Sequence, residues 1–549
     1  MIIPPEKDLD SFASDLVSRC MSTRRERIGA YSGLKHYFLF GSQEGDQAPF
    51  NKIFPHIDLL TSFLYSQSTV EYDIGVQNKP DLVFQQARLI SGRTNTLFHD
   101  QGVADMFAEA LTWALVFNST FLKLNWEGGI EPYMIEPHNF GVLREDVPLL
   151  ERQEAFTHAY TISRDELQRR IMGLPNAADI MRRVQAAPVQ DEDAFPEAIN
   201  RLIVAGTVDM TSTTTRGLVN VPDLLGQLQY KPRTNEDLVE MYELWVWDDK
   251  KEDYRTITLA APGVVIYGRE KIGNLFGIKG EHPFIHICPN RLYDYFFGWS
   301  EITMLLKLQD WMTTRLREIK TILTKQARPP KAFSGWGGIS DEKFGAMDNP
   351  GAWMSDPTPN AKVDILAPDL PNDMWVDIRN IADMFNDESG LSDVLQGKGE
   401  SGVRTKGQAD ILARLGSARI KKRALSVERT LEEIGDVIVM LMKAKDPHQF
   451  KLQDGNPFFA RQFTDEYQVH VDAHSASPVF VDDHVQLLFG LNKAGALSPA
   501  DLIRGTKPPR TEELVQNYEK MASEKALQEQ QQMALGLVTG GKKPQPRAA

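Results

Sequence analysis

The chain has 549 residues and a formal net charge of −14, and 42% of its residues are hydrophobic and 25% charged. Since one domain usually takes roughly 100–200 residues, two to four structural units are expected. The composition is that of a soluble globular protein and excludes a disordered or fibrous chain. The acidic balance excludes a uniformly basic nucleic-acid-binding coat, although local basic stripes remain possible.

The sequence gives no sign of export or membrane insertion. Its two cysteines, Cys20 and Cys288, lie far apart, which is no disulfide framework and suits a reducing cytoplasm. The first ten residues, MIIPPEKDLD, lack the basic segment and apolar run of a secretory signal. The longest apolar stretches, such as 434–442, are far shorter than the roughly 20 residues that span a bilayer.

The first 297 residues combine helical and strand patterns. Apolar residues at steps of three or four predict helices, and a two-residue period predicts strands. Ser163 is expected to cap the helix that follows it. A polar segment rich in Pro and Thr is interpreted as a surface excursion. The predicted elements are helices at 8–36, 56–72, 78–120 and 164–183, a hairpin at 121–135, strands at 154–162, 239–248 and 255–267, and the excursion at 184–236.

Two long helices dominate the rest of the chain. The first is predicted to begin at Gly298-Trp299-Ser300, with Ser300 as its N-cap, and to end before Pro329. The second contains apolar residues at alternating steps of three and four, a narrow seam that suits packing on a long partner helix. The seam residues are Ala424, Val427, Leu431, Ile434, Ile438 and Leu441. The predicted elements are helices at 298–326, 371–387, 406–445, 482–494, 498–504 and 511–533, and strands at 352–354, 362–366 and 464–474.

No motif predicts catalysis. The glycine-rich segment 397–403 matches a phosphate-binding pattern, but helices are predicted on both sides, where that chemistry needs a preceding strand. The segment 536–543 lacks the hydroxyl residue that would hold magnesium in a nucleotide-binding loop. His470, Asp472 and His474 share one face of a predicted strand, but a solvent-facing polar strand explains them better than a metal site.

Basic residues gather around the two long helices. Residues 301–331 hold seven bases and three acids, and residues 411–427 hold five bases and no acid. The glycine-rich loop adds Lys398, Arg404 and Lys406. Either these are solvated helix faces and inter-subunit ion pairs, or they form a surface that touches a polyanion weakly, so that a DNA duplex can slide.

The order of these elements resembles the portal (head-to-tail connector) proteins of tailed double-stranded DNA bacteriophages. Local sequence agrees at WALVFNSTFLKLNW (113–126), at IEPHNFGV (135–142), at FGWS (297–300) and at Ser401-Gly402 before a long helix. The resemblance implies an α+β, mainly helical fold with a wing, a stem of two helices, a small α/β clip, a tunnel loop and a crown. The implied ranges are wing 1–297, first stem helix 298–328, clip 329–372, second stem helix 373–395, tunnel loop 396–406, wing helix and strand 407–480, crown 481–533 and disordered tail 534–549.

The resemblance also implies a function and its partners. The chain would form a ring, usually of twelve copies, at one capsid vertex of a virion assembled in the bacterial cytoplasm. Double-stranded DNA would pass through the ring without sequence-specific contacts, in packaging and in ejection. Other implied partners are the terminase large subunit, the major capsid protein and scaffold, and a head-completion, adaptor or tail protein, with no membrane, metal or cofactor.

The resemblance assigns two sets of residues to the channel. The DNA-facing tunnel loop would present Lys398, Arg404 and Lys406. The basic residues that line the channel or stem would be Arg315, Lys320, Lys325 and Arg328. The seam from Ala424 to Leu441 would pack within the wing and against the neighbouring copy.

Two other readings stay open. A nucleic-acid-acting enzyme would need converging carboxylates, for which Asp472, Asp482 and Asp483 are the local candidates, and would show metal-dependent nuclease or ATPase activity. A structural adaptor without a channel would allow a monomer or dimer in native mass measurements.

Overall fold

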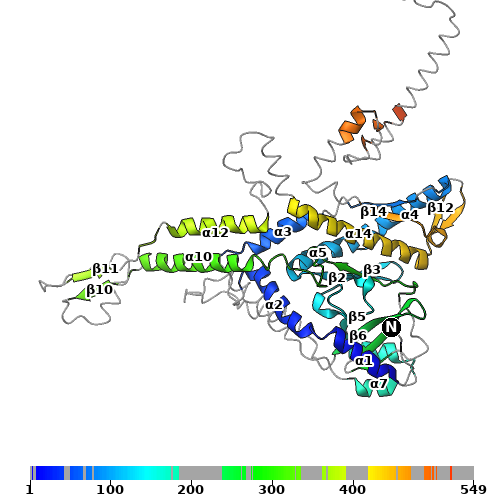
Figure 1. Ribbon diagram of the computed structural model, residues 1–549, viewed down its shortest axis with the longest axis horizontal. Coiled ribbons are helices and arrows are strands. Elements are labelled where there is room, and N and C mark those ends of the chain that lie inside the picture. Colours follow the sequence, from blue (N-terminus) through cyan, green and yellow to red (C-terminus); the bar gives the residue numbers. More distant parts are fainter. Residues whose placement is uncertain are drawn as a thin grey trace, which may run out of the picture. The chain divides into compact units, whose positions relative to one another are not determined.

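The computed structural model divides the chain into two compact units, Met1–Asp472 and Ala473–Ala549. The first unit carries nearly all of the described structure (Figure 1). The second is described only over a short helix at 488–493 and the few residues near it. The described residues are 3, 8–42, 50–65, 70–76, 79–174, 177–184, 238–260, 263–266, 274, 276–327, 329, 331–334, 362–365, 369–371, 373–390, 418–452, 455–471, 488–495, 497–499, 502–503, 518 and 520–521.

Helices and strands both contribute to the first unit, as the α+β prediction requires. The helices are α1 (Leu9–Cys20), α2 (Arg24–Phe40), α3 (Ile53–Leu64), α4 (Asp81–Asp100), α5 (Val103–Phe117), α6 (Arg164–Ile171), α7 (Ala177–Arg183), α10 (Leu306–Ala327), α12 (Asp373–Ser389) and α14 (Ala418–Lys445). The strands are β1 (Tyr72–Gly75), β2 (Thr120–Trp126), β3 (Ile130–Ile135), β4 (Phe140–Val142), β5 (Ala155–Ser163), β6 (Leu238–Asp248), β7 (Asp253–Ala260), β8 (Val264–Val265), β9 (Phe284–Ile287), β10 (Lys331–Ser334), β11 (Lys362–Ile365), β12 (Gln449–Lys451), β13 (Pro457–Phe459) and β14 (Gln468–Val471).

All strand pairs are antiparallel. One sheet has the order β3-β2-β9 and a second has the order β4-β5-β6-β7-β8, while β1-β14, β10-β11 and β12-β13 form separate two-stranded sheets. The hairpin predicted at 121–135 is β2-β3, in which Phe121 pairs with Ile135. The pairing of β1 with β14 joins two segments almost 400 residues apart, so the C-terminal part of this unit returns to its N-terminal part.

Aromatic side chains form the core between the two larger sheets. The Phe121 ring of β2 stacks on that of Phe140 of β4, with centroids 4.0 Å apart. The Phe284 ring of β9 meets Phe156 of β5 and Trp245 of β6 edge-on, at 5.6 Å and 5.7 Å. All five are completely buried. Edge-on and offset contacts of this kind add to the free energy of burying the rings themselves.

Helices cover the outer faces of these sheets. The apolar side of α1, including Leu9 and Leu16, packs on Leu244 and Ile257 of the five-stranded sheet. The short helices α6 and α7 instead bury Leu167 against Ile162 and Met241, which lie on the same face of this sheet as Trp245 and so extend the core at one end of the strands. Helix α5 contacts all three strands of the other sheet. Each sheet therefore has one face on the aromatic core and another under a helix, which is the arrangement expected for a two-layer unit.

Two helices predicted as continuous are each interrupted. The segment 8–36 divides into α1 and α2 at residues 21–23, where the Thr23 hydroxyl donates to Glu145 at 2.5 Å. The segment 78–120 divides into α4 and α5 at Gly102, whose φ of +74° is a conformation that glycine adopts readily. Apolar periodicity continues through both breaks, so it could not locate them. The cap at Ser163 is confirmed, since its Oγ accepts from the Glu166 backbone N–H at 3.2 Å.

Helix α14 is the longest described helix, with 28 residues. It contacts α3, α4, β2, β9 and β14 of its own chain, which a narrow seam for one long partner helix does not predict. The structure buries all six seam residues, Ala424, Val427, Leu431, Ile434, Ile438 and Leu441. Residues 406–417, predicted as the start of this helix, lie outside the described residues, as do 185–236 of the predicted excursion and the tail 534–549.

Candidate functional site

Helices α10 and α12 form an antiparallel hairpin that ends in β10-β11 (Figure 1). Arg315 of α10 donates to Asp377 of α12 at 2.7 Å and to Glu318 of its own helix at 2.8 Å. Ile319 of α10 and Ile381 of α12 are both buried. The returning helix predicted at 371–387 and the strand predicted at 362–366 agree with α12 and β11, whereas 352–354 lies outside the described residues.

Polar contacts fix the base of this hairpin to α2 and α3. The completely buried Gln309 donates to the Phe50 carbonyl at 2.7 Å and accepts from the Lys52 backbone N–H at 3.1 Å. The Lys52 ammonium donates to the Ala382 carbonyl at 3.1 Å and to Asn386 at 3.0 Å. Both hairpin helices are therefore tied to the same short segment of chain.

The first hairpin helix begins at Leu306, so the prediction that Ser300 is its N-cap is wrong. The Ser300 hydroxyl instead donates to the carbonyl of Val116, at the end of α5, at 2.6 Å. The next backbone N–H, of Glu301, donates to the Leu115 carbonyl at 2.9 Å. These bonds hold residues 300–305 in turns against α5, and the helix begins only after them.

A buried ionic cluster connects the start of the hairpin to α14. The Glu301 carboxylate, 2% exposed, accepts from Arg423 at 2.8 Å and from Asn290 at 3.0 Å. His56 Nε2 lies 3.7 Å from the same carboxylate. Burial alone would raise the pKa of Glu301, but His56, Arg423 and Asn290 together lower it below its usual value. The carboxylate is therefore ionised at neutral pH, and its charge is balanced by Arg423.

Gly298 provides a sharp turn immediately before this cluster, with φ of +73°. A Cβ added there would collide with Cys288 Sγ and lie 2.7 Å from the Asn290 carbonyl oxygen. We expect Gly298→Ala to lower the free energy of unfolding by about 1–3 kcal/mol from backbone strain, and further from the collision. Urea unfolding measures this. Gly102→Ala is the control, because its φ is +74° but nothing lies within 4 Å of its added Cβ; equal losses in the two variants would contradict the collision.

The two hairpin helices carry opposite charge. Helix α10 contains five basic and two acidic side chains, whereas α12 contains five acidic and one basic. Lys307 and Lys320 are exposed on α10, and Asp373 and Asp383 are exposed on α12. A single chain therefore presents a basic helix on one side of the hairpin and an acidic helix on the other.

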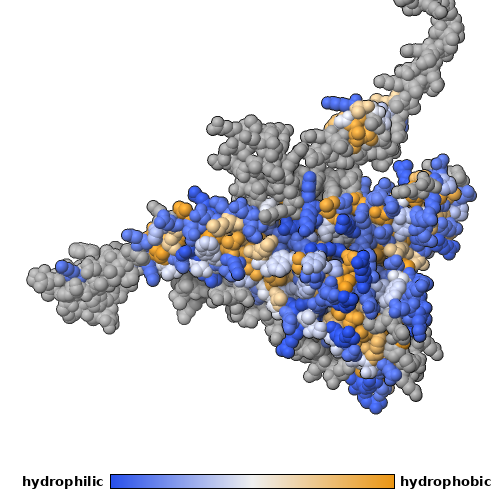
Figure 2. Space-filling model, viewed as in Figure 1, coloured by the Kyte–Doolittle hydropathy of each residue, from blue (hydrophilic) through white to orange (hydrophobic). Residues whose placement is uncertain are grey.

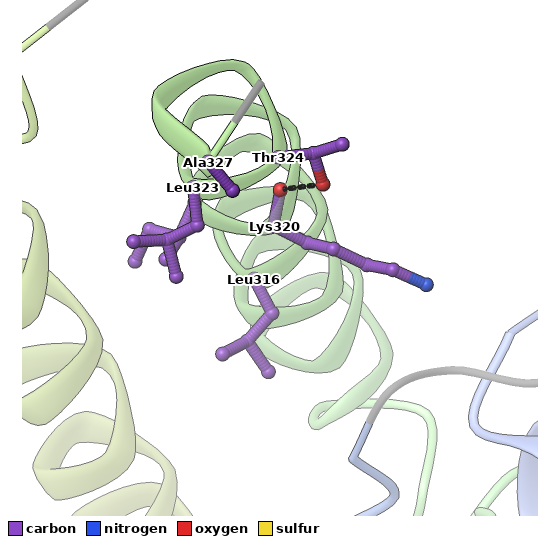
Figure 3. A pocket seen from close by; sticks show the side chains of 6 residues that line it. Leu316, Lys320, Leu323, Thr324 and Ala327 are labelled. Carbon is purple, nitrogen blue, oxygen red and sulfur yellow. Dashed lines mark hydrogen bonds between the residues drawn. The ribbon is translucent and has the colours of Figure 1, made fainter. Parts of the chain in front are cut away.

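Large apolar side chains are also exposed on the hairpin, as the hydrophobic residues over it in Figure 2 show. On α12, Trp375 and Val376 are 50% and 52% exposed. On α10, an open groove of about 460 Å³ runs along one side of the helix. It is lined by Leu316, Ile319, Lys320, Leu323, Thr324 and Ala327. Figure 3 shows Lys320 extending away from Leu323, so the groove has an apolar side and a basic edge. Exposed apolar surface of this extent is typical of interfaces.

The structure describes only some of the residues that are predicted to line the channel. The guanidinium of Arg315 is engaged by Asp377 and Glu318, so within the single chain it stabilises the hairpin. Lys320 and Lys325 are exposed. Arg328 and the loop bases Lys398, Arg404 and Lys406 lie outside the described residues.

The ionic contacts that position the hairpin were not predicted. Glu301 and Arg423 are 122 residues apart, and neither belongs to a motif. A second buried contact of this kind joins the two larger sheets, where Lys123 of β2 donates to Glu243 of β6 at 2.7 Å. One signal was available for Glu301, namely an acid inside the apolar run that precedes Leu305.

Metal and thiol chemistry find no support in the described part of the chain. No group of three potential metal ligands was found among the described residues. Burial raises the pKa of the thiols of Cys20 and Cys288 to about 12, so both are protonated at neutral pH. None of the described helices combines the length and hydropathy needed to cross a bilayer.

No protein-family profile matches this chain, and no curated protein matches it. Among solved structures, it is similar to a chain of the virion of a native gene transfer agent particle, with 11% identity, a TM-score of 0.40, and coverage of 88% of this chain and 97% of that chain. It is also similar to chains in the neck of the empty particle and in the neck of the native particle computed with C12 symmetry. Both have 12% identity and coverage of 85% of this chain and 90% of the other, with TM-scores of 0.38 and 0.39.

Proposed function

We propose that the chain is a structural component of a phage-like particle, in which copies form a portal ring for the passage of double-stranded DNA. The observation that carries this proposal is the helical hairpin α10–α12, which ends in β10-β11 and is fixed at its base to the sheet-containing part of the chain. In this proposal the hairpin and β10-β11 would correspond to the stem and the clip of the portal family that the sequence resembles. A rigid hairpin with exposed apolar and charged sides suits packing beside identical hairpins around an axis.

In this proposal each part of the chain has a role. The unit before the hairpin and helix α14 form the wing, residues 329–372 the clip and residues 481–533 the crown. The clip would meet terminase during packaging and a head-completion, adaptor or tail protein afterwards. Lys398, Arg404 and Lys406 would approach the DNA. An acidic chain with few DNA-facing bases would hold the duplex weakly, which permits sliding because affinity grows with the number of phosphates neutralised.

The proposal predicts closed rings of the purified full-length chain. We expect negative-stain images with a central hole and native masses near twelve times 61.9 kDa. We also expect no metal-dependent nuclease or ATPase activity. A monomer or dimer at every concentration would contradict the ring and favour an adaptor without a channel, whereas metal-dependent activity would favour the enzyme.

A further inference from the structure

We infer that α10 binds α12 from a second copy of this chain, through Lys320 on one copy and Asp373 on the next. This inference rests on the proposed ring and names the surface that holds it together. It assigns Lys320 to contact between copies and not to the channel wall.

The first argument is charge. Both side chains are exposed, and the two helices that carry them have opposite net charge. Two copies related by a rotation can bring the α10 side of one hairpin against the α12 side of the next. Such a contact joins two different surfaces, so repeating it generates a ring when the rotation closes. A two-fold contact that pairs α10 with α10 would instead oppose like charges, which is unfavourable.

The second argument is the height of each charge along the hairpin. The bond between Arg315 and Asp377 shows that these residues lie at one level. Because the helices are antiparallel and rise ~1.5 Å per residue, Lys320 is level with position 372. Asp373 is therefore within about 2 Å of the matching height. Rotation about a ring axis parallel to the hairpin leaves heights unchanged, so the two opposite charges can meet.

The third argument is the apolar surface beside this pair of charges. By the same rule, Val376 of α12 is level with Leu316 of α10, which lines the groove. Val376 is 52% exposed and lies three residues after Asp373, and Leu316 lies four residues before Lys320, so each apolar side chain shares one side of its helix with the charge. Removing Val376 and Leu316 from water beside the ion pair would give the contact an apolar part next to a charged one.

Charge reversals test the inference with the full-length chain. The first variant is K320E and the second is D373K. Each alone places like charges against each other, and we expect the fraction of chain in rings to fall at least tenfold. An equimolar mixture restores opposite charges at every contact, and we expect rings in which the two variants alternate. The readouts are native mass and negative-stain imaging.

A control with the same change in net charge as K320E is K250E, at the exposed turn between β6 and β7, which should form rings like the unmodified chain. Unfolding midpoints check that each variant folds. Normal rings from K320E alone would overturn the inference and leave the ring proposal intact. Failure of the mixture, when both variants are folded, would also overturn it. Absence of rings from the unmodified chain would overturn both.

Discussion

Replacing Glu301 with alanine is expected to lower the free energy of unfolding by about 3–5 kcal/mol, the usual loss when one partner of a buried ion pair is removed. The side chain is 2% exposed, and it balances the charge of Arg423, whose side chain is 13% exposed. Without Glu301, the Arg423 guanidinium keeps a single described hydrogen-bond acceptor, Asn290 at 3.1 Å. None of the other groups that contact Glu301 is negatively charged, so none replaces its carboxylate. Moreover, Asn290 loses the acceptor of its own amide N–H.

Urea unfolding of the full-length chain measures this loss. Glu318→Ala is the matched control, because Glu318 also pairs with an arginine but is 45% exposed, where an ion pair contributes roughly 0–1 kcal/mol. The double variant Glu301→Ala/Arg423→Ala should lose much less than the sum of the two single variants, since each single change already breaks the pair. Additive losses, or a loss from Glu301→Ala no larger than that of the control, would show that the cluster does not hold the hairpin to α14.

Acid should destabilise the first unit steeply between pH 6.5 and 4, because buried histidines are neutral in the folded chain. Burial lowers the pKa of His158 and His282 to about 4, and burial together with Arg24 and other nearby cations does the same for His138. Burial holds the pKa of His286 well below its usual value. The unfolded chain binds these protons near pH 6.5, so the stabilisation is complete above that pH and is lost as pH falls. One pKa unit is worth about 1.4 kcal/mol per group.

Buried carboxyl groups on α14 act in the opposite direction. Burial raises the pKa of Glu433 to about 8, and burial with the neighbouring Glu432 and Glu281 raises that of Asp436 to about 6. The folded chain keeps these protons where the unfolded chain has lost them. Their contribution is therefore complete below about pH 4, and it is lost as pH rises through 6 and 8. The free energy of unfolding should thus pass through a maximum on the acid side of neutrality.

Urea unfolding at a series of pH values tests both slopes. His286→Phe should reduce the acid slope by up to one proton, because neither ring nitrogen has a described partner and the ring already stacks on Phe296 at 4.4 Å. Glu433→Gln should remove the loss of stability that this group contributes as pH rises towards 8, and should therefore make the rise in stability between pH 5 and 6.5 steeper. An acid slope that His286→Phe leaves unaltered would contradict the assignment of the protons to the buried histidines.

Local patterns were sufficient to predict much of the fold. The alternation over 121–135 identified the β2-β3 hairpin, and Ser163 identified the start of α6, because both depend on neighbouring residues only. Apolar periodicity located α10 and α12, since their packed faces repeat every three or four residues. The order of these elements, more than any single motif, carried the prediction of the candidate site.

The features that the sequence did not predict depend on contacts between residues that are distant in sequence. Serine is a favoured N-cap residue, but the Ser300 hydroxyl donates to the carbonyl of Val116, which is 184 residues away. The break before Arg24 allows that side chain to reach Glu240, 216 residues away. The seam of α14 indicated packing on a long helix, but it did not predict the contacts with β2, β9 and β14. Such contacts are fixed by tertiary packing, and no local pattern in a single sequence encodes them.

The two buried thiols have a practical consequence. Cys20 and Cys288 are each 1% exposed, and their pKa values of about 12 leave almost no thiolate at neutral pH, which is the form that reacts with maleimides. The chain therefore serves, without removal of either cysteine, as a background for single engineered cysteines. A fluorophore attached at an exposed hairpin position such as Thr321 would report the spacing between neighbouring copies by energy transfer as they assemble.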